Sequence, residues 1–171
     1  TAPNRFMAFG PRSLLASLAF TGSIAACVIS SRLSPACAAD WPQFRGPARN
    51  GISTEKGWSA RWPKQGPKTV WKVNVGKGHS SVAVSGGRVY TMGNSADKDT
   101  VFCLDAATGR TVWKQNYRCP AKDYPGPRST PTVSGGRVYT FSRDAQLYCL
   151  AAASGKVLWS RNLMRDHKVQ S

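Results

Sequence analysis

The side chains of this sequence that could bind a metal or carry out redox chemistry are its cysteines and histidines. The five cysteines are Cys27, Cys37, Cys103, Cys119 and Cys149. No two of them have the CxxC spacing, and the two histidines, His79 and His167, lie far apart in the sequence, so spacing does not support a metal site. Cys103 and Cys149 stand in two similar apolar runs, which favours a role as small buried hydrophobic residues. The disulfide state of Cys103, Cys119 and Cys149 stays open.

The carboxylates give little support for acid–base catalysis. Glu55 is the only glutamate, and it precedes the repeated part of the chain. Asp105 is the most conspicuous carboxylate, and it begins the run "DAATGR", where its side chain can accept hydrogen bonds from the following turn. We therefore expect a structural role for Asp105 and name no catalytic or metal-binding residue.

The elements that would position any site come from an internal repeat. The heptapeptide "SGGRVYT" occurs at residues 85–91 and again at 134–140, within two longer repeats at 80–117 and 129–163. Each repeat contains short β-branched or aromatic runs separated by turn residues, with no long stretch of helical periodicity. Repeats of this length built from strands are typical of β-propellers. Each repeat is thus predicted to form one four-stranded antiparallel sheet.

Glycines and tryptophans recur at matching positions in the two repeats. Paired glycines supply the positive φ angles of a tight hairpin, and a Thr-Gly or Ser-Gly pair turns the third strand into the fourth. A tryptophan four residues later can cover the neighbouring sheet. The residues expected to carry this repeat structure are Asp105, Gly109, Trp113, Gly155, Trp159, Trp71, Gly86, Gly87, Gly135 and Gly136.

The run "CLDAATGRTVW" resembles the tryptophan-docking motif of pyrroloquinoline quinone (PQQ) repeat propellers. This family includes quinoprotein dehydrogenases and cofactor-free relatives such as the outer-membrane assembly lipoprotein. The second copy, "CLAAASGKVLW", has Ala151 where the first has Asp105. The opening "DWPQFRGPARNGIS" is similar to the start of exported PQQ-binding-like propeller proteins. The resemblance implies an all-β, quinoprotein-like β-propeller of four-stranded antiparallel blades, present here as an N-terminal fragment with about two complete blades plus a closing strand around Trp71.

Three segments are expected along the chain. Residues 1–39, with a start at Met7, read as a signal peptide, because an apolar run is followed by small residues that suit a signal peptidase. A retained membrane anchor, or a lipoprotein modified at Cys27, are the alternatives. Residues 40–68 form an N-terminal extended segment. Residues 69–171 form the partial propeller, with a strand at 69–76 before the two repeats.

Two functions remain open at this stage. The chain is either an exported binding or assembly scaffold without a cofactor, or a fragment of a PQQ-dependent alcohol dehydrogenase, which would need PQQ and calcium. The resemblance implies an adjacent Cys-Cys pair in such dehydrogenases, and no two cysteines are adjacent here. The net charge of +16 is spread singly, which suits a protein partner or an anionic or carbohydrate ligand of the cell envelope better than nucleic acid. The loop at 117–130, with Lys122 and Tyr124, is either the contact region for such a partner or a crossover between blades held by its prolines. The protein is expected in the periplasm or outside the cell.

Overall fold

The computed structural model describes residues 39–59, 61–120 and 126–168. The predicted signal peptide, up to residue 38, lies outside these residues, as do Lys122 and Tyr124 of the loop at 117–130. Within the described ranges, no helix is long and apolar enough to cross a membrane.

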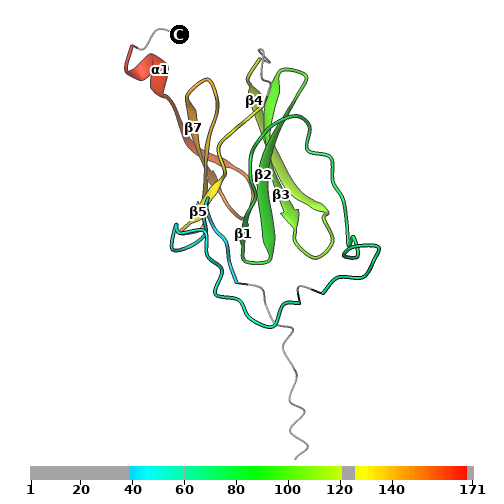
Figure 1. The fold of residues 1–171 in the computed structure, drawn as a ribbon. Coiled ribbons are helices and arrows are strands. Elements are labelled where there is room, and N and C mark those ends of the chain that lie inside the picture. Colours follow the sequence, from blue (N-terminus) through cyan, green and yellow to red (C-terminus); the bar gives the residue numbers. More distant parts are fainter. Residues whose placement is uncertain (1–38, 60, 121–125, 169–171) are drawn as a thin grey trace, which may run out of the picture. The chain divides into compact units, whose positions relative to one another are not determined.

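The two repeats form two four-stranded antiparallel sheets, each with its strands in sequence order (Figure 1). This confirms the predicted all-β fold and the assignment of one sheet to each repeat. We call them blade 1 and blade 2. Blade 1 contains β1 (Ala83–Ser85), β2 (Arg88–Ser95), β3 (Lys98–Asp105) and β4 (Thr111–Arg118). Blade 2 contains β5 (Thr132–Ser134), β6 (Arg137–Phe141), β7 (Gln146–Ala151) and β8 (Val157–Asn162), followed by the short helix α1 (Leu163–Asp166).

The first hairpin of each blade turns on a pair of glycines. The φ angles are 58° and 71° at Gly86 and Gly87, and 54° and 71° at Gly135 and Gly136. Two successive residues with positive φ match the right-handed twist of the flanking strands, and glycine adopts this conformation without steric cost. The two hairpins therefore have nearly the same backbone conformation.

The second hairpin of blade 1 is built differently. It turns on Ala96 and Asp97, whose φ angles of 49° and 58° are unusual for residues with a side chain. The strands on either side pair without interruption, from Arg88 opposite Asp105 to Ser95 opposite Lys98. The long ladder thus holds the turn in a conformation that its own residues do not favour.

Burial along β3 follows the period of two expected for strands as far as Cys103. In β3 the buried residues Asp99, Val101 and Cys103 alternate with residues that are exposed or half-buried. Both blades show a register shift at the same place, after Cys103 and after Cys149. Such bulges increase local twist, and their equivalent positions show that the two sheets are distorted in the same way.

The N-terminal segment lies between the first strands of the two blades. Trp41 forms an antiparallel bridge with Val84 of β1, with N–O distances of 2.8 and 2.9 Å. The next residue, Pro42, accepts a hydrogen bond of 2.7 Å from the backbone N–H of Val133 in β5. This segment therefore links the two blades through backbone hydrogen bonds.

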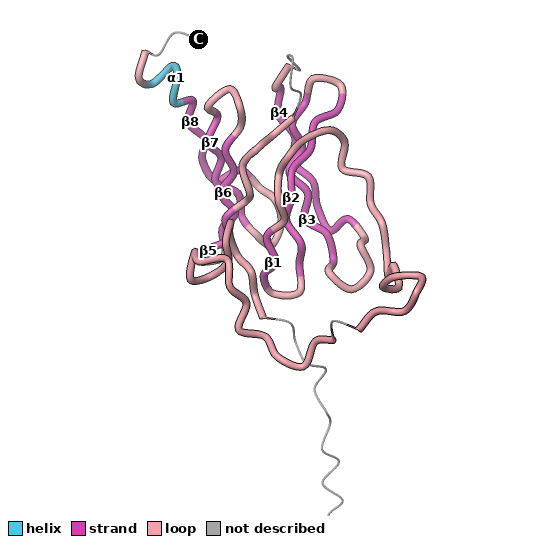
Figure 2. The backbone as a smooth tube through the Cα atoms, viewed as in Figure 1, coloured by secondary structure: helices cyan, strands magenta, loops and turns pink. Residues whose placement is uncertain are grey.

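The strand predicted at 69–76 is not formed. Between Pro42 and β1, the described residues contain no named strand and are drawn as loop in Figure 2. Only the adjacent Lys77 forms a bridge, to Asn94 of β2. A strand needs a partner ladder along its length, and among the described residues 69–76 have none, so this segment is extended without being part of a sheet.

Candidate functional site

Two tryptophans join neighbouring elements of the fold in the same way. The indole of Trp113, on β4, donates from Nε1 to the backbone oxygen of Ala152 at 2.9 Å, across the gap between the blades. Its ring lies over Gly155, where a Cβ atom would come within 2.5 Å of it. Trp71 repeats this geometry on blade 1, with a hydrogen bond of 2.9 Å to the backbone oxygen of Ala106. Glycine is required at 155 under Trp113 and at 109 under Trp71, because a side chain at either position would occupy the space of the indole.

Trp159 occupies the equivalent position on blade 2 but has a different environment. It stacks obliquely with Tyr139 at 6.2 Å, as Trp113 does with Tyr90 at 6.0 Å. However, Trp159 is 43% exposed, whereas Trp113 is 9% exposed. The sequence predicts the same ring at the same strand position, and the structure shows that only Trp113 of these two is covered by a neighbouring blade.

Asp105 is committed to the turn between β3 and β4. Its Oδ1 atom accepts hydrogen bonds from the N–H and the hydroxyl of Thr108, at 2.8 and 2.7 Å. The hydrogen bonds from Thr108 lower the pKa of the Asp105 carboxyl. In blade 2, Ala151 has no side-chain acceptor, and its backbone oxygen accepts hydrogen bonds from Gly155 N–H at 2.8 Å and from Ser154 N–H at 3.3 Å. The carboxylate therefore closes a turn, as the sequence led us to expect.

A cleft of about 570 Å³ separates the first hairpins of the two blades. Its walls include both Ser-Gly-Gly turns, Arg88 and the N-terminal Asp40. The Asp40 carboxylate accepts hydrogen bonds from Ser85 Oγ at 2.7 Å and from Gly86 N–H at 3.0 Å. The N-terminal segment thus enters the cleft and binds the blade 1 turn through a carboxylate.

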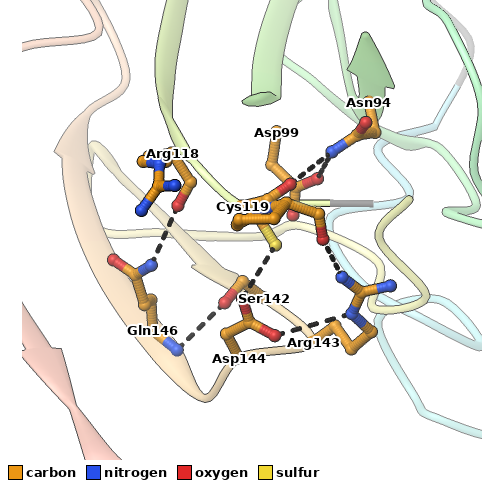
Figure 3. Close-up of polar contacts among 9 residues, drawn as sticks. Asn94, Asp99, Arg118, Cys119, Ser142, Arg143, Asp144 and Gln146 are labelled. Carbon is orange, nitrogen blue, oxygen red and sulfur yellow. Dashed lines mark hydrogen bonds and ion pairs between the residues drawn. The ribbon is translucent and has the colours of Figure 1, made fainter. Parts of the chain in front are cut away.

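A network of polar side chains fills the other end of the junction between the blades (Figure 3). Asn94 Nδ2 donates to Asp99 Oδ1 at 2.8 Å and to the backbone oxygen of Cys119 at 2.9 Å. The Cys119 sulfur lies 3.6 Å from Asp144 Oδ2, in the loop between β6 and β7. Gln146 Nε2 donates to the backbone oxygen of Arg118 at 3.1 Å. These contacts connect the end of β4 to the far blade, so we call this network the polar junction.

The thiols at the blade interfaces are protonated at neutral pH. Burial raises the pKa of Cys119 most, the nearby Asp99 and Asp144 add to it by disfavouring the thiolate, and together they bring it to about 12. Burial also raises the pKa of Cys103. Because the thiolate is the nucleophile, neither side chain is suited to covalent catalysis. Cys103, Cys119 and Cys149 are all free and buried, which agrees with the prediction of buried hydrophobic residues at 103 and 149.

Three buried oxygen atoms near the polar junction have no hydrogen-bond partner among the described residues: Asp99 Oδ2, Tyr117 OH and Thr140 Oγ1. Asp99 is fully buried and Thr140 is 2% exposed. Such groups are usually satisfied by ordered water in folded proteins. The arrangement suits a hydrated structural contact between the blades.

Sequence reasoning missed Asp99 and Asp40. Asp99 stands in phase with Val101 and Cys103, so the alternation of β3 could have marked it as inward-facing. Asp40 had no comparable signal, because its partner Ser85 lies far along the chain. Among the described residues, no group of three or more histidine, cysteine, aspartate or glutamate side chains is placed to hold a metal ion.

Comparisons with known proteins agree on the fold. A family model described as outer membrane protein assembly factor BamB matches residues 58–170. The structure of quinohemoprotein alcohol dehydrogenase from Comamonas testosteroni superposes with a TM-score of 0.55 and 24% identity, over 75% of this chain and 20% of that chain. This likeness supports the quinoprotein-like fold. A search of curated proteins finds no match.

Two further solved structures are similar over shorter stretches. BamB from Moraxella catarrhalis gives a TM-score of 0.38 and 18% identity, over 51% of this chain and 25% of that chain. A europium-containing methanol dehydrogenase gives 0.43 and 21%, over 56% of this chain and 18% of that chain. The chain thus spans a quarter or less of the length of each of these relatives.

Proposed function

The chain belongs to the PQQ-repeat family described as outer membrane protein assembly factor BamB, and on that premise we propose that it acts as an exported binding or assembly scaffold. Family membership alone leaves a dehydrogenase equally open, because quinohemoprotein alcohol dehydrogenase shares the fold. The choice between them depends on what the side chains of the two blades do.

The observation that favours a scaffold is that the carboxylates and the thiol that could take part in catalysis make structural contacts instead. Asp105 closes a turn through Thr108, and Asp99 bonds Asn94 inside the polar junction. Cys119 is 1% exposed and holds its proton at neutral pH. These contacts hold blade 1 in shape, and the indole of Trp113 docks blade 1 onto blade 2. They make a rigid platform that presents loops to a partner.

The proposed partner is a protein or an anionic or carbohydrate ligand of the cell envelope. The chain carries 24 Lys and Arg residues against 8 Asp and Glu residues, and this excess attracts anionic groups. Export by the signal in residues 1–39, to the periplasm or the cell exterior, belongs to this proposal, with lipid attachment at Cys27 as the alternative.

The second candidate function is that of a PQQ-dependent dehydrogenase, and the fold similarity is what favours it. In such an enzyme the quinone would accept the electrons of the alcohol, with calcium beside it. The described residues do not fit this cofactor pair, because the thiols of Cys103, Cys119 and Cys149 stand apart and no acidic cluster is placed for a cation. We therefore derive no catalytic step for them and expect no cofactor.

Reconstitution with PQQ and calcium tests the proposed function. After desalting, we expect no quinone absorbance on the protein and no dye-linked oxidation of simple alcohols. An apo-quinoprotein dehydrogenase treated in parallel serves as the positive control. Stoichiometric retention of PQQ together with alcohol-dependent dye reduction would overturn the scaffold function.

A further inference from the structure

The two blades carry the same hairpin turn, but in the part of the chain that the structure describes only one of the two turns is bonded to a carboxylate. In blade 1, Asp40 accepts hydrogen bonds from Ser85 Oγ and Gly86 N–H. Both donors point into the cleft between the blades, since Ser85, Gly86 and Asp40 all line it. The Ser-Gly-Gly turn is therefore shown to bind a carboxylate within this protein.

The turn of blade 2 offers the same donors. Ser134 pairs with Arg137 as Ser85 pairs with Arg88, and the glycine φ angles of the two turns agree within a few degrees. The third residue of each turn accepts the same backbone bond, of 3.0 Å at Gly87 and 2.9 Å at Gly136. Yet among the described residues neither Ser134 Oγ nor Gly135 N–H has a hydrogen-bond partner.

The charge around the second turn also differs from that around the first. Arg88 lies opposite Asp105 across the β2–β3 ladder, whereas Arg137 lies opposite Ala151. Blade 2 thus lacks the carboxylate that faces the arginine in blade 1. Arg137 is exposed, and it pairs with Ser134 across the hairpin, so the two side chains leave the same face of the sheet.

We propose that the turn Ser134–Gly136, together with Arg137, is a binding site for a carboxylate group supplied from outside the two blades. Ser134 Oγ and Gly135 N–H donate to one carboxylate, as their counterparts do to Asp40, and Arg137, the cross-strand partner of Ser134, adds positive charge on the same face. Hydrogen bonds to a charged acceptor are stronger than those between neutral groups. The site deepens the proposed scaffold function, because it names the chemistry of a group that a partner would present to the cleft.

The carboxylate has two possible sources, an acidic side chain of a partner protein or a small carboxylic acid. The backbone of β5 does not decide between these two sources. Val133 N–H already donates to Pro42 O, so a strand of a partner protein could not form with β5 the two-bond bridge that Trp41 forms with Val84. Two probes distinguish the sources: acetate, and the capped tripeptide acetyl-Ala-Asp-Ala-amide.

The test is a titration followed by the amide resonances of Gly135 and Gly86 in the ¹⁵N-labelled protein. Either probe should move Gly135 in a saturable way, with a dissociation constant in the millimolar range for so exposed a site. Gly86 should stay in place because Asp40 already occupies it. In Asp40→Asn both amides should move, and in Ser134→Ala the response of Gly135 should fall at least threefold. The tripeptide with Asn in place of Asp, and sodium chloride at equal ionic strength, are the matched controls.

The results of the titration distinguish the two sources of the carboxylate and show whether the site exists. Tighter binding of the tripeptide than of acetate supports a protein partner, and equal or weaker binding supports a small acid. A linear shift of Gly135 that sodium chloride reproduces would overturn the site, as would a response of Gly86 in Asp40→Asn without any response of Gly135. Because the readout needs no quinone, failure at Gly135 leaves the scaffold function standing, and retention of PQQ in the reconstitution overturns the scaffold function without touching the carboxylate site.

Discussion

Replacing Trp113 by alanine should cost much more stability than replacing Trp159, although the two residues hold the same position in their repeats. Trp113 is 9% exposed, packs over Gly155 and donates a hydrogen bond to Ala152 O. Trp159 is 43% exposed. Comparing the two alanine variants therefore separates the stability contributed by docking between blades from the stability contributed by any aromatic ring on the fourth strand.

The size of the difference follows from burial and from the hydrogen bond. The extra burial of Trp113 amounts to about a third of an indole surface of roughly 250 Å², which at about 25 cal/mol/Å² gives about 2 kcal/mol. The hydrogen bond from Nε1 contributes about 1 kcal/mol more. We therefore expect Trp113→Ala to lower the free energy of unfolding by about 4 kcal/mol, within the usual range for a buried aromatic, and Trp159→Ala by about 1 kcal/mol.

Urea unfolding followed by far-ultraviolet circular dichroism measures both variants without depending on tryptophan fluorescence. Trp113→Phe keeps an aromatic ring but removes the indole N–H, so it should fall between the wild type and Trp113→Ala. Equal losses for the two alanine variants, at unchanged m-values, would refute the conclusion that Trp113 docks onto blade 2.

Three further predictions concern the turns and the interface. Gly155→Ala should lower the free energy of unfolding by about 2 kcal/mol more than Gly135→Ala in thermal or urea unfolding, because both residues have positive φ but only the Cβ at 155 meets the Trp113 ring, at 2.5 Å. Ala151→Asp should raise the free energy of unfolding by about 0.5–1 kcal/mol, because it supplies the turn with the carboxylate acceptor that blade 1 already has; a neutral or lower value in the same assay contradicts this. The Cys119 pKa of about 12 lies above the ordinary value of 9.0, so the folded state keeps a proton that the unfolded chain releases, and stability should be lost as the pH rises from 9 towards 12. Cys119→Ala should flatten this alkaline slope, and an unchanged slope in a pH series of urea unfolding curves would contradict the assignment.

Local signals in the sequence were sufficient to predict the sheets and their first hairpins. The pairs Gly86-Gly87 and Gly135-Gly136 require positive φ angles in a two-residue loop, and this requirement depends on no distant residue. The position of the tryptophan on the fourth strand, four residues after a glycine, could be predicted in the same way. Because the repeat occurs twice, the same turn and strand signals appear in both copies. The two copies therefore predict the same strand order independently.

Other features depend on neighbours that no local pattern reveals. Ala96 and Asp97 form a turn without glycine, because the long ladder of β2 and β3 fixes its geometry. The segment at 69–76 has strand-like composition but forms no strand, since strand formation is decided by a partner ladder. The environment of Trp159 differs from that of Trp113 for the same reason: identical positions in two repeats face different surroundings.

The differences between the repeats point to the cleft rather than the polar junction as the surface open to a partner. Asp99, Asn94 and Cys119 in the polar junction are buried, and the Cys119 sulfur lies against Asp144 of blade 2, so these groups are not open to an outside partner. The cleft is open, and there the backbone of the two turns is the same while the carboxylates are not. Blade 1 has Asp40 at its turn, and no carboxylate among the described residues takes the equivalent place at the turn of blade 2. Since two turns of one sequence and one backbone have the same donors, a protein that binds a carboxylate at the first has the means to bind one at the second.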